Sequence, residues 1–328
     1  MQKLTHPPTL RDNMAKTKED LAKSREIREE VIKKFGEVPT SIWTPDYGWG
    51  KHIIELDSRK QQAMAKKKHE KMDYGNEKSW DSKLDGNSKD ELAKAFGMSS
   101  QNVRGKQSGL STFPPDLARR IVEFYSEKGD TVLDPCCGHN SRMQVTYEME
   151  RNYIGYDVCK EFMDFNRNIA DEIQGKGEQA VLFAPKSTII LREQSSERMI
   201  EDDNSIDMVY TSPPYYDIEY YDEHPDQLGY GHTYDEFMEG ITRLLSESFR
   251  VLKNDKYCVW NINDFRKDGD YFMYHADIAR AMERVGFKLW DIVIVAWKSC
   301  IGACFASQIV DRKINAKKHE FLIVGKKI

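Results

Sequence analysis

The sequence predicts an α/β protein built around a mainly parallel, doubly wound sheet. Short apolar runs typical of buried strands, at 131–133, 152–157 and 206–210, alternate along the chain with segments of helical periodicity. A polar residue ends or directly follows each run, and the carboxyl ends of parallel strands meet at one edge of a sheet. We therefore expect a ligand site at that edge.

The composition is that of a soluble protein with one large domain and an appendage. Of 328 residues, 39% are hydrophobic and 31% are charged. No run approaches about 18 apolar residues and the amino terminus has no apolar stretch like that of a signal peptide, so we expect a cytoplasmic protein outside any membrane. The six cysteines form no CxxC pair, so we expect free thiols, with neither a zinc site nor a disulfide framework.

Residues 1–110 read as a helical and irregular extension. Segments of helix-forming composition at 15–36, 58–72 and 90–96 are separated by polar stretches rich in glycine or proline. Lys and Arg exceed Asp and Glu by five in this part, whereas residues 111–328 carry a net charge of −10. The extension is therefore the candidate region for meeting DNA phosphates, with a solvated helical face as the alternative explanation of its charge.

Two further segments have residues suited to nucleic acid. In the extension, aromatic side chains interleave with Pro and Gly, where they either stack on splayed bases or, as we favour, pin the loop onto the body. These aromatics are Trp43, Tyr47 and Trp49. Near the carboxyl terminus, the loop 299–318 is a second candidate phosphate surface, with Arg312, Lys313, Lys317 and Lys318.

A nucleotide-binding arrangement begins at residue 113. The pattern predicts a helix over 113–128, with Leu117, Ile121, Val122 and Phe124 on its buried side. A strand at 131–133 then runs into Asp134, Pro135 and a turn containing Gly138, and a helix follows over 141–150. A strand, a glycine turn and a helix amino terminus bring the backbone close to a bound nucleotide.

A carboxylate ends the next strand. Asp157 closes the run 152–157, and it lies 23 residues after Asp134, close to the spacing at which a second-strand acid meets a ribose diol. Its oxygens accept hydrogen bonds from two hydroxyl groups. A further strand over 187–192 precedes Gln194 and Ser195.

The remaining pattern completes the sheet. It predicts helices at 234–251 and 274–285, a strand at 257–263, and a terminal antiparallel pair of strands at 287–297 and 320–324.

The stretch 207–215 is the candidate catalytic centre. A core strand runs into Ser212, Pro213, Pro214 and Tyr215, and the two prolines stiffen the turn and remove two backbone donors. We expect the carbonyls of this turn to point outward and unpaired. Together with the Ser212 hydroxyl they would accept hydrogen bonds from an exocyclic amino group, while Tyr215 stacks on the heterocycle.

This stretch resembles the (D/N/S)PP(Y/F/W) signature of the DNA amino methyltransferases. The resemblance covers about residues 111–328 and implies a Rossmann-like class I methyltransferase fold, a seven-stranded sheet with a terminal antiparallel hairpin, and S-adenosylmethionine as cofactor. It implies that the catalytic turn acts on N4 of cytosine or N6 of adenine in a flipped base. The implied cofactor-binding residues are Phe113, Pro115, Asp134, Pro135, Cys136, Gly138, Asn140, Asp157, Val158, Gln194 and Ser195.

The cofactor loop departs from the family pattern D-P-F-x-G-x-G at two positions. Cys136 replaces the phenylalanine, and Asn140 stands where a second glycine is usual. Asn tolerates positive φ better than most residues, so we expect the turn to survive.

The resemblance also suggests the substrate, which is double-stranded DNA bound by a monomer or a homodimer. Ser212 at the first motif position resembles the cytosine-N4 enzymes more than the adenine-N6 enzymes, and Val-Pro-Thr-Ser-Ile at 38–42 resembles phage-type methyltransferases with a long amino-terminal extension. Cytosine carbon-5 chemistry is excluded because the only Pro-Cys pair, Pro135-Cys136, lies in the cofactor loop. An RNA or protein N-methyltransferase and an inactive DNA-binding homologue remain the alternatives.

Overall fold

The computed structural model describes residues 18–35, 40–43, 113–174, 187–216, 224–229, 232–297, 313–315 and 317–328. The chain divides into two compact units, Met1–Ser41 and Ile42–Ile328. Helix α1 (Lys18–Phe35) is the described helix of the first unit and confirms the helix expected over 15–36. The segments 58–72 and 90–96, Tyr47, Trp49 and most of the loop 299–318 lie outside the described residues.

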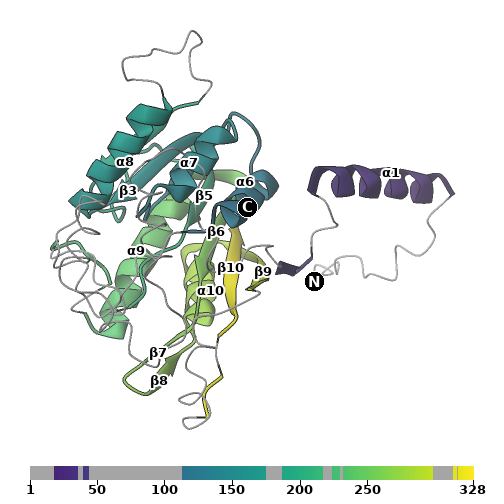
Figure 1. Ribbon diagram of the computed structural model, residues 1–328. Coiled ribbons are helices and arrows are strands. Elements are labelled where there is room, and N and C mark those ends of the chain that lie inside the picture. The colour runs from purple at the N-terminus through teal and green to yellow at the C-terminus, as the bar shows by residue number, and fades with distance from the viewer. Residues whose placement is uncertain are drawn as a thin grey trace, which may run out of the picture. The chain divides into compact units, whose positions relative to one another are not determined.

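The second unit is a sheet with helices on both faces (Figure 1). Its helices are α6 (Pro115–Tyr125), α7 (Ser141–Glu148), α8 (Lys160–Ile173), α9 (Tyr234–Val251) and α10 (Tyr274–Val285). Its strands are β1 (Ile42–Trp43), β2 (Thr131–Asp134), β3 (Asn152–Asp157), β4 (Ile189–Glu193), β5 (Ile206–Thr211), β6 (Leu252–Ile262), β7 (Phe265–Lys267), β8 (Asp270–Phe272), β9 (Lys288–Ala296) and β10 (His319–Lys326).

The main sheet has the strand order β1-β9-β10-β6-β5-β2-β3-β4. The pairs from β4 to β6 are parallel, and β10 runs antiparallel between β6 and β9. This confirms the mainly parallel sheet with a terminal antiparallel hairpin. The eighth strand is the two-residue β1, which pairs in parallel with β9 and adds to the seven expected strands.

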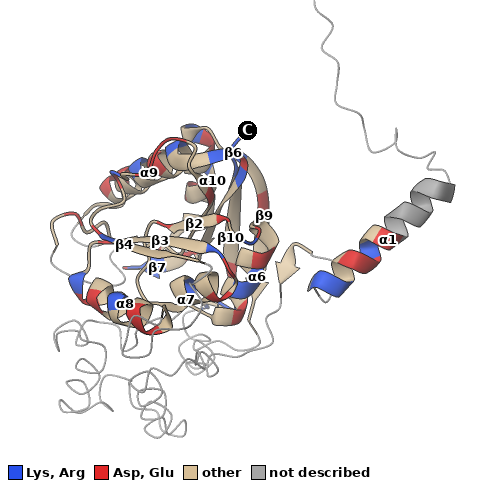
Figure 2. Ribbon diagram, turned by 90° about the horizontal axis from the view of Figure 1, so that it is seen from above, with Lys and Arg blue, Asp and Glu red and all other residues tan. Residues whose placement is uncertain are grey.

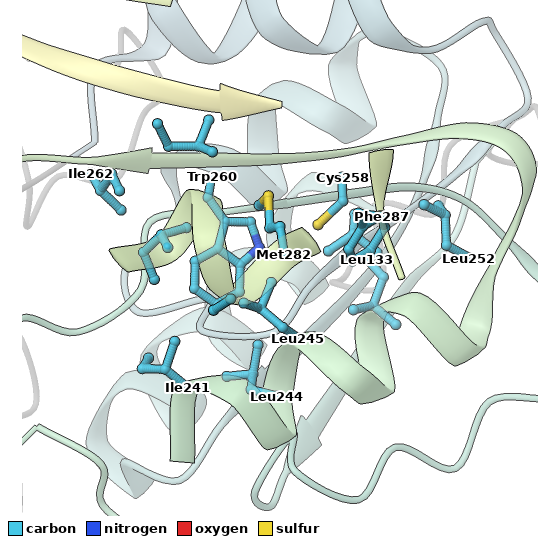
Figure 3. Packing of buried hydrophobic residues seen from close by; sticks show 14 of the residues in the cluster. Leu133, Ile241, Leu244, Leu245, Leu252, Cys258, Trp260, Ile262, Met282 and Phe287 are labelled. Carbon is cyan, nitrogen blue, oxygen red and sulfur yellow. The ribbon is translucent and has the colours of Figure 1, made fainter. Parts of the chain in front are cut away.

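The helices cover both faces of the main sheet, and a separate apolar core lies on each face. On one face α9 and α10 pack over β2, β5 and β6, and Figure 3 shows Trp260 surrounded by Ile241, Leu245 and Met282. On the other face α6 covers the centre of the sheet and α7 and α8 cover its β3–β4 side. Strands buried on both faces are a feature of parallel sheets, so the apolar runs in the sequence were continuous rather than alternating.

Helix α9 has the bounds that the sequence predicts because its amino terminus is encoded locally. The Thr233 hydroxyl accepts a hydrogen bond from the Glu236 backbone N–H, and the Glu236 carboxylate accepts one from the Thr233 N–H. This capping box satisfies two donors that a helix start leaves without intrahelical partners. None of the described helices is both long enough and apolar enough to cross a membrane.

One predicted burial is wrong in helix α6. Phe124 is 39% exposed, and Tyr125 takes the buried position instead. Leu117, Ile121 and Tyr125 recur every four residues and so share the buried face, whereas Phe124 lies at its edge. There the Trp43 ring, which is 1% exposed, meets Phe124 edge-on at 6.1 Å. The Arg120 guanidinium lies 4.5 Å from the centre of the Trp43 ring. Trp43 therefore pins its segment onto the body, as the favoured reading of the aromatic loop expected.

Candidate functional site

The predicted site residues gather at the carboxyl edge of the parallel strands. Asp134 is the last residue of β2, Asp157 is the last residue of β3, and Ser212 directly follows β5. Strand β2 pairs with β3 on one side and with β5 on the other, so the three strand ends are neighbours. This juxtaposition of the cofactor loop and the catalytic turn is what the sequence predicts.

The buried side chain of Asp134 connects strand β2 to β5, α7 and β3 through hydrogen bonds. Its carboxylate is fully buried and accepts hydrogen bonds from the Thr211 hydroxyl at 2.7 Å, from Arg142 Nε at 2.6 Å and from the Tyr153 hydroxyl at 3.0 Å. Burial alone would lower the pKa of Arg142, and the attraction of Asp134 more than reverses that effect. Asp134 is thus a structural link between the end of β2 and β5, the strand that leads into the candidate catalytic turn.

The loop after Asp134 needs a glycine at one position. Gly138 has φ +48°, in the left-handed region that favours glycine, and no atom lies within 4 Å of a Cβ built there. Its N–H donates to Asp157 Oδ2 at 2.8 Å, and its carbonyl accepts from Asn166 Nδ2 of α8 at 2.7 Å. The loop is therefore fastened to the end of β3 and to α8.

The second glycine of the family loop is not needed for backbone conformation here. Asn140 has φ −61° and ψ −13°, an ordinary right-handed helical conformation, and it directly precedes α7 without a side-chain capping hydrogen bond. Its buried amide donates to Gln144 Oε1 at 2.8 Å. The turn survives, but for a different reason from the tolerance of positive φ that the sequence suggested.

The cysteine in the loop is a neutral thiol. Burial raises the pKa of Cys136, and the nearby carboxylates of Asp157 and Asp134 raise it further. The Cys136 N–H lies 3.3 Å from Asp134 Oδ1. The described cysteines Cys136, Cys137, Cys159 and Cys258 are all free thiols. Across the described ranges, no group of three His, Cys, Asp or Glu side chains is placed to hold a metal ion.

Asp157 is oriented by two backbone donors. Besides the Gly138 N–H, which binds Oδ2, the Cys159 N–H donates to Oδ1 at 2.9 Å. Burial raises the pKa of this carboxyl to about 6, even though both backbone hydrogen bonds act in the opposite direction. Each oxygen keeps lone pairs for a further donor. An oriented diol would fit this acceptor pair.

The other predicted cofactor residues border the same edge. Val158 follows β3, and Gln194 and Ser195 follow β4, whose last residue is in register with Asp157. Gln194 Nε2 donates to the Arg198 carbonyl at 3.3 Å, and Ser195 Oγ accepts from the Glu197 N–H at 3.3 Å.

Phe113 and Pro115 lie at the start of α6. Pro115 is the first residue of the helix, where a proline costs no hydrogen bond. The Phe113 ring meets Tyr210 of β5 edge-on at 5.7 Å, and the Arg142 guanidinium lies 5.2 Å from its centre. Phe113 is therefore wedged between the catalytic strand and the arginine that binds Asp134. Pro135, the remaining loop residue, is buried.

The candidate catalytic turn, Ser212–Tyr215, is packed against aromatic side chains from later segments of the chain. Pro213 is buried, whereas Ser212 and Tyr215 are half-buried. The Tyr215 ring lies 5.9 Å from Tyr274 and 6.2 Å from Phe265, centre to centre. One part of the sequence reading is wrong, because the Pro214 carbonyl does not stay free and accepts a hydrogen bond from the Tyr274 hydroxyl at 3.3 Å.

Three residues that hold the site were not found from the sequence. Arg142, Thr211 and Tyr274 touch the predicted residues from α7, β5 and α10. Thr211 and Arg142 were within reach of inference, since both flank predicted motifs and match the hydrogen-bonding needs of a buried acid. Tyr274 comes from 60 residues beyond Pro214 and carries no local signal.

The chain is similar in sequence to known DNA methyltransferases. A family model described as DNA methylase, of the N6/N4 type, matches residues 9–169 and 206–327. The Type II methyltransferase M.MjaI of Methanocaldococcus jannaschii is 40% identical over 50 residues, which are 15% of this chain and 16% of that protein. M.BglII of Bacillus subtilis is 33% identical over 136 residues, 40% of this chain and 36% of its own length.

These matches therefore span well under half the length of either relative. Among solved structures, a TehB-like methyltransferase dependent on S-adenosylmethionine, from Corynebacterium glutamicum, aligns with a TM-score of 0.41 and 13% identity, over 74% of this chain and all of that one. The sheet order and the strand directions are those of a Rossmann-like class I methyltransferase fold. Because the family model covers most of its length, the chain belongs to the DNA methylase family of N6/N4 amino methyltransferases.

Proposed function

We propose that this protein transfers a methyl group from S-adenosylmethionine to the exocyclic amino group of a flipped base in double-stranded DNA. The observation that carries the proposal is the hydrogen bond from Thr211 to Asp134, which fastens the strand leading to Ser212 to the loop that precedes Gly138. A transfer between two bound molecules needs their sites held at fixed separation and angle. Family membership supports the same activity.

The residues at the strand ends fit S-adenosylmethionine. The oriented carboxylate of Asp157 suits the two ribose hydroxyls, and Gly138 leaves open space where a side chain would project. Val158, Gln194 and Ser195 would border the adenine, and Phe113, Pro115 and Cys136 would lie beside the methionine part. When bound, the cofactor supplies an electrophilic methyl group on a sulfonium centre.

The catalytic turn would prepare the amine. The lone pair of an exocyclic amine is delocalised into the ring, which makes the nitrogen a poor nucleophile. The Ser212 hydroxyl and the Pro213 carbonyl would each accept a hydrogen bond from the amino group and so localise its lone pair, while the Tyr215 ring would stack on the base. No protein nucleophile is needed. Ser212 at the first motif position favours cytosine N4 over adenine N6 as the target.

Residues 1–110 are our proposed DNA-recognition region. Two observations support this: Lys and Arg outnumber Asp and Glu in the segment, and the family model matches from residue 9 onward. The layout resembles phage-type enzymes, and we propose a cytoplasmic role in modifying DNA, either as protection from restriction or as regulation.

The proposal is tested by following label from tritiated S-adenosylmethionine into mixed-sequence duplex DNA, with nucleoside analysis of the product. We expect N4-methylcytosine. Label in N6-methyladenine would keep the activity but change the base. Cofactor binding without label in DNA would point to RNA or protein as the substrate, and failure to bind S-adenosylmethionine would identify an inactive homologue.

The pKa of Asp157 gives this site a specific pH dependence. Because burial raises that pKa to about 6, the carboxyl becomes protonated as the pH falls from 7 to 5 and loses acceptor capacity for the ribose hydroxyls. We expect the dissociation constant of S-adenosylmethionine to rise about tenfold over this interval, since one pH unit below the pKa leaves about a tenth of the group ionised.

The measurement is calorimetric titration of the cofactor at pH 5, 6, 7 and 8. The control is Asp157→Asn, which should bind weakly and without this pH dependence. A wild-type affinity that stays constant from pH 8 to 5 would show that Asp157 does not hold the ribose.

A further inference from the structure

A β-hairpin projects beside the catalytic turn. Strands β7 and β8 follow β6 at its carboxyl end, and Figure 1 shows them extending beyond α10 at one end of the unit. At the base of the hairpin, Phe265 and Phe272 stack at 5.0 Å, and Phe265 also meets Tyr215 at 6.2 Å. The base of the hairpin is thus packed against the turn that would hold the target base.

One face of this hairpin has two cations on a single ring. Arg266 and Tyr271 are directly opposite each other in the antiparallel register. The Arg266 guanidinium lies 4.9 Å from the centre of the Tyr271 ring, and Lys317 Nζ lies 4.7 Å from it. Tyr271 is 45% exposed. We call Arg266, Tyr271 and Lys317 the hairpin basic face.

Asp264 holds this face in place. Its carboxylate accepts hydrogen bonds from the Tyr271 hydroxyl at 3.0 Å and from His275 at 2.6 Å, and its backbone carbonyl accepts one from Lys317 Nζ. Tyr271 and Lys317 are therefore oriented by the same residue. A face with fixed geometry can bind a ligand without first ordering its own side chains.

Within the described parts of the chain, neither Arg266 nor Lys317 forms an ion pair with a carboxylate. Burial lowers the pKa of Lys317 to about 8, with Asp264 opposing and Arg266 adding to the effect. Two like charges held over one ring repel each other, and a bound anion would relieve that repulsion.

The charges elsewhere on this unit make the face distinctive. Along α8 and α9 both signs are interspersed (Figure 2). In the hairpin itself, Asp270 is in register with Lys267, so it belongs to the opposite face from Arg266 and Tyr271. Asp268 lies at the tip, in the two-residue turn with Gly269.

We propose that the hairpin basic face binds a phosphodiester of the DNA strand whose base enters the turn at Ser212–Tyr215. This inference rests on the proposed function and adds the surface that grips the substrate backbone. A guanidinium and an ammonium close to the same exposed tyrosine ring match a phosphate group, to which arginine can donate two hydrogen bonds. The ring contact between Phe265 and Tyr215 places the hairpin next to the turn that would hold the target base.

The test compares Arg266→Gln with Lys288→Gln. Lys288 is an exposed cation that also lies over an aromatic ring, that of Trp290, but it begins β9, at the opposite edge of the sheet from the carboxyl end of β6. Both variants lose one positive charge. Binding of a fluorescent duplex is measured by anisotropy in the full-length protein at several salt concentrations.

For Arg266→Gln we expect the dissociation constant to rise roughly fivefold to tenfold at 0.1 M salt. The slope of log affinity against log salt should become shallower by about 0.9, the loss of one phosphate contact. Lys288→Gln should match the wild type. An unchanged slope for Arg266→Gln, an equal change in both variants, or a wild type that does not bind duplex DNA would each overturn the proposal.

The methyl-transfer assay separates this proposal from the proposed function. If the wild type methylates DNA but the salt slope of Arg266→Gln is unchanged, the hairpin basic face does not bind a phosphate and the proposed methyltransferase activity stands. If the salt slope of Arg266→Gln is shallower but the wild type transfers no methyl group to DNA, phosphate binding by the hairpin basic face is supported and the proposed methyltransferase activity is refuted. Tyr271→Phe keeps the ring and loses the bond to Asp264, so we expect an intermediate weakening of DNA binding.

Discussion

Replacing Tyr215 with alanine is expected to lower the turnover number for DNA methylation by at least about 100-fold. The ring would hold the flipped base in line with the methyl group, and a misplacement of about 1 Å costs roughly that factor. Cofactor affinity should stay within about threefold of the wild type, because the aromatic rings that Tyr215 packs against, Phe265 and Tyr274, lie outside the predicted cofactor residues. Single-turnover methyl transfer and calorimetric binding of S-adenosylmethionine measure the two effects separately.

The matched variant is Tyr215→Phe, which keeps the aromatic face and removes only the hydroxyl. We expect it to retain at least about a third of the activity, as stacking depends on the ring. If Phe is as inactive as Ala, the hydroxyl and not the ring is needed. If Ala is as active as the wild type, Tyr215 does not position the base.

Replacing Arg142 with methionine is expected to destabilise the protein by about 3–5 kcal/mol. The change leaves the Asp134 carboxylate buried without its cationic partner, and breaking a buried ion pair from one side has a cost of that order. Thr211 and Tyr153 would still donate hydrogen bonds, which limits the loss to this range. Urea unfolding followed by circular dichroism gives the free energy of unfolding.

Arg243→Met is the control for this stability measurement. Arg243 pairs with Glu197 at 2.7 Å, but its side chain is 56% exposed, so we expect a loss of only about 0–1 kcal/mol. Equal losses in the two variants would mean that the link at Asp134 contributes no more than a surface pair.

Much of the fold follows from the sequence because parallel strands buried on both faces leave unbroken apolar runs. The strand at 152–157 and the helices at 234–251 and 274–285 have the predicted bounds. The grouping of Asp134, Asp157 and Ser212 was also predictable, since strand direction alone places their strand ends at one edge.

Two features of the structure were not predicted from the sequence. One is a contact between distant segments, and the other is a short hairpin whose turn residues gave a weak signal. The contact of the Trp43 ring with Phe124 joins residues about 80 positions apart, and Trp43 lies in a region without clear periodicity. The hairpin β7–β8 had a signal, because Asp268-Gly269 is a preferred two-residue turn and both residues have positive φ. Its strands are only three residues each, too short for alternation to stand out.

The burial of Trp43 bears on how the extension would deliver a recognition element. Trp43 and Phe113, which flank residues 44–112, belong to the same apolar core beneath α6. The two residues that flank this stretch are therefore both fixed to the same body. A recognition element within the stretch, as we propose, would be tethered to that body at a high effective concentration. Lengthening the stretch should weaken this advantage only slowly, because closure entropy grows with the logarithm of length.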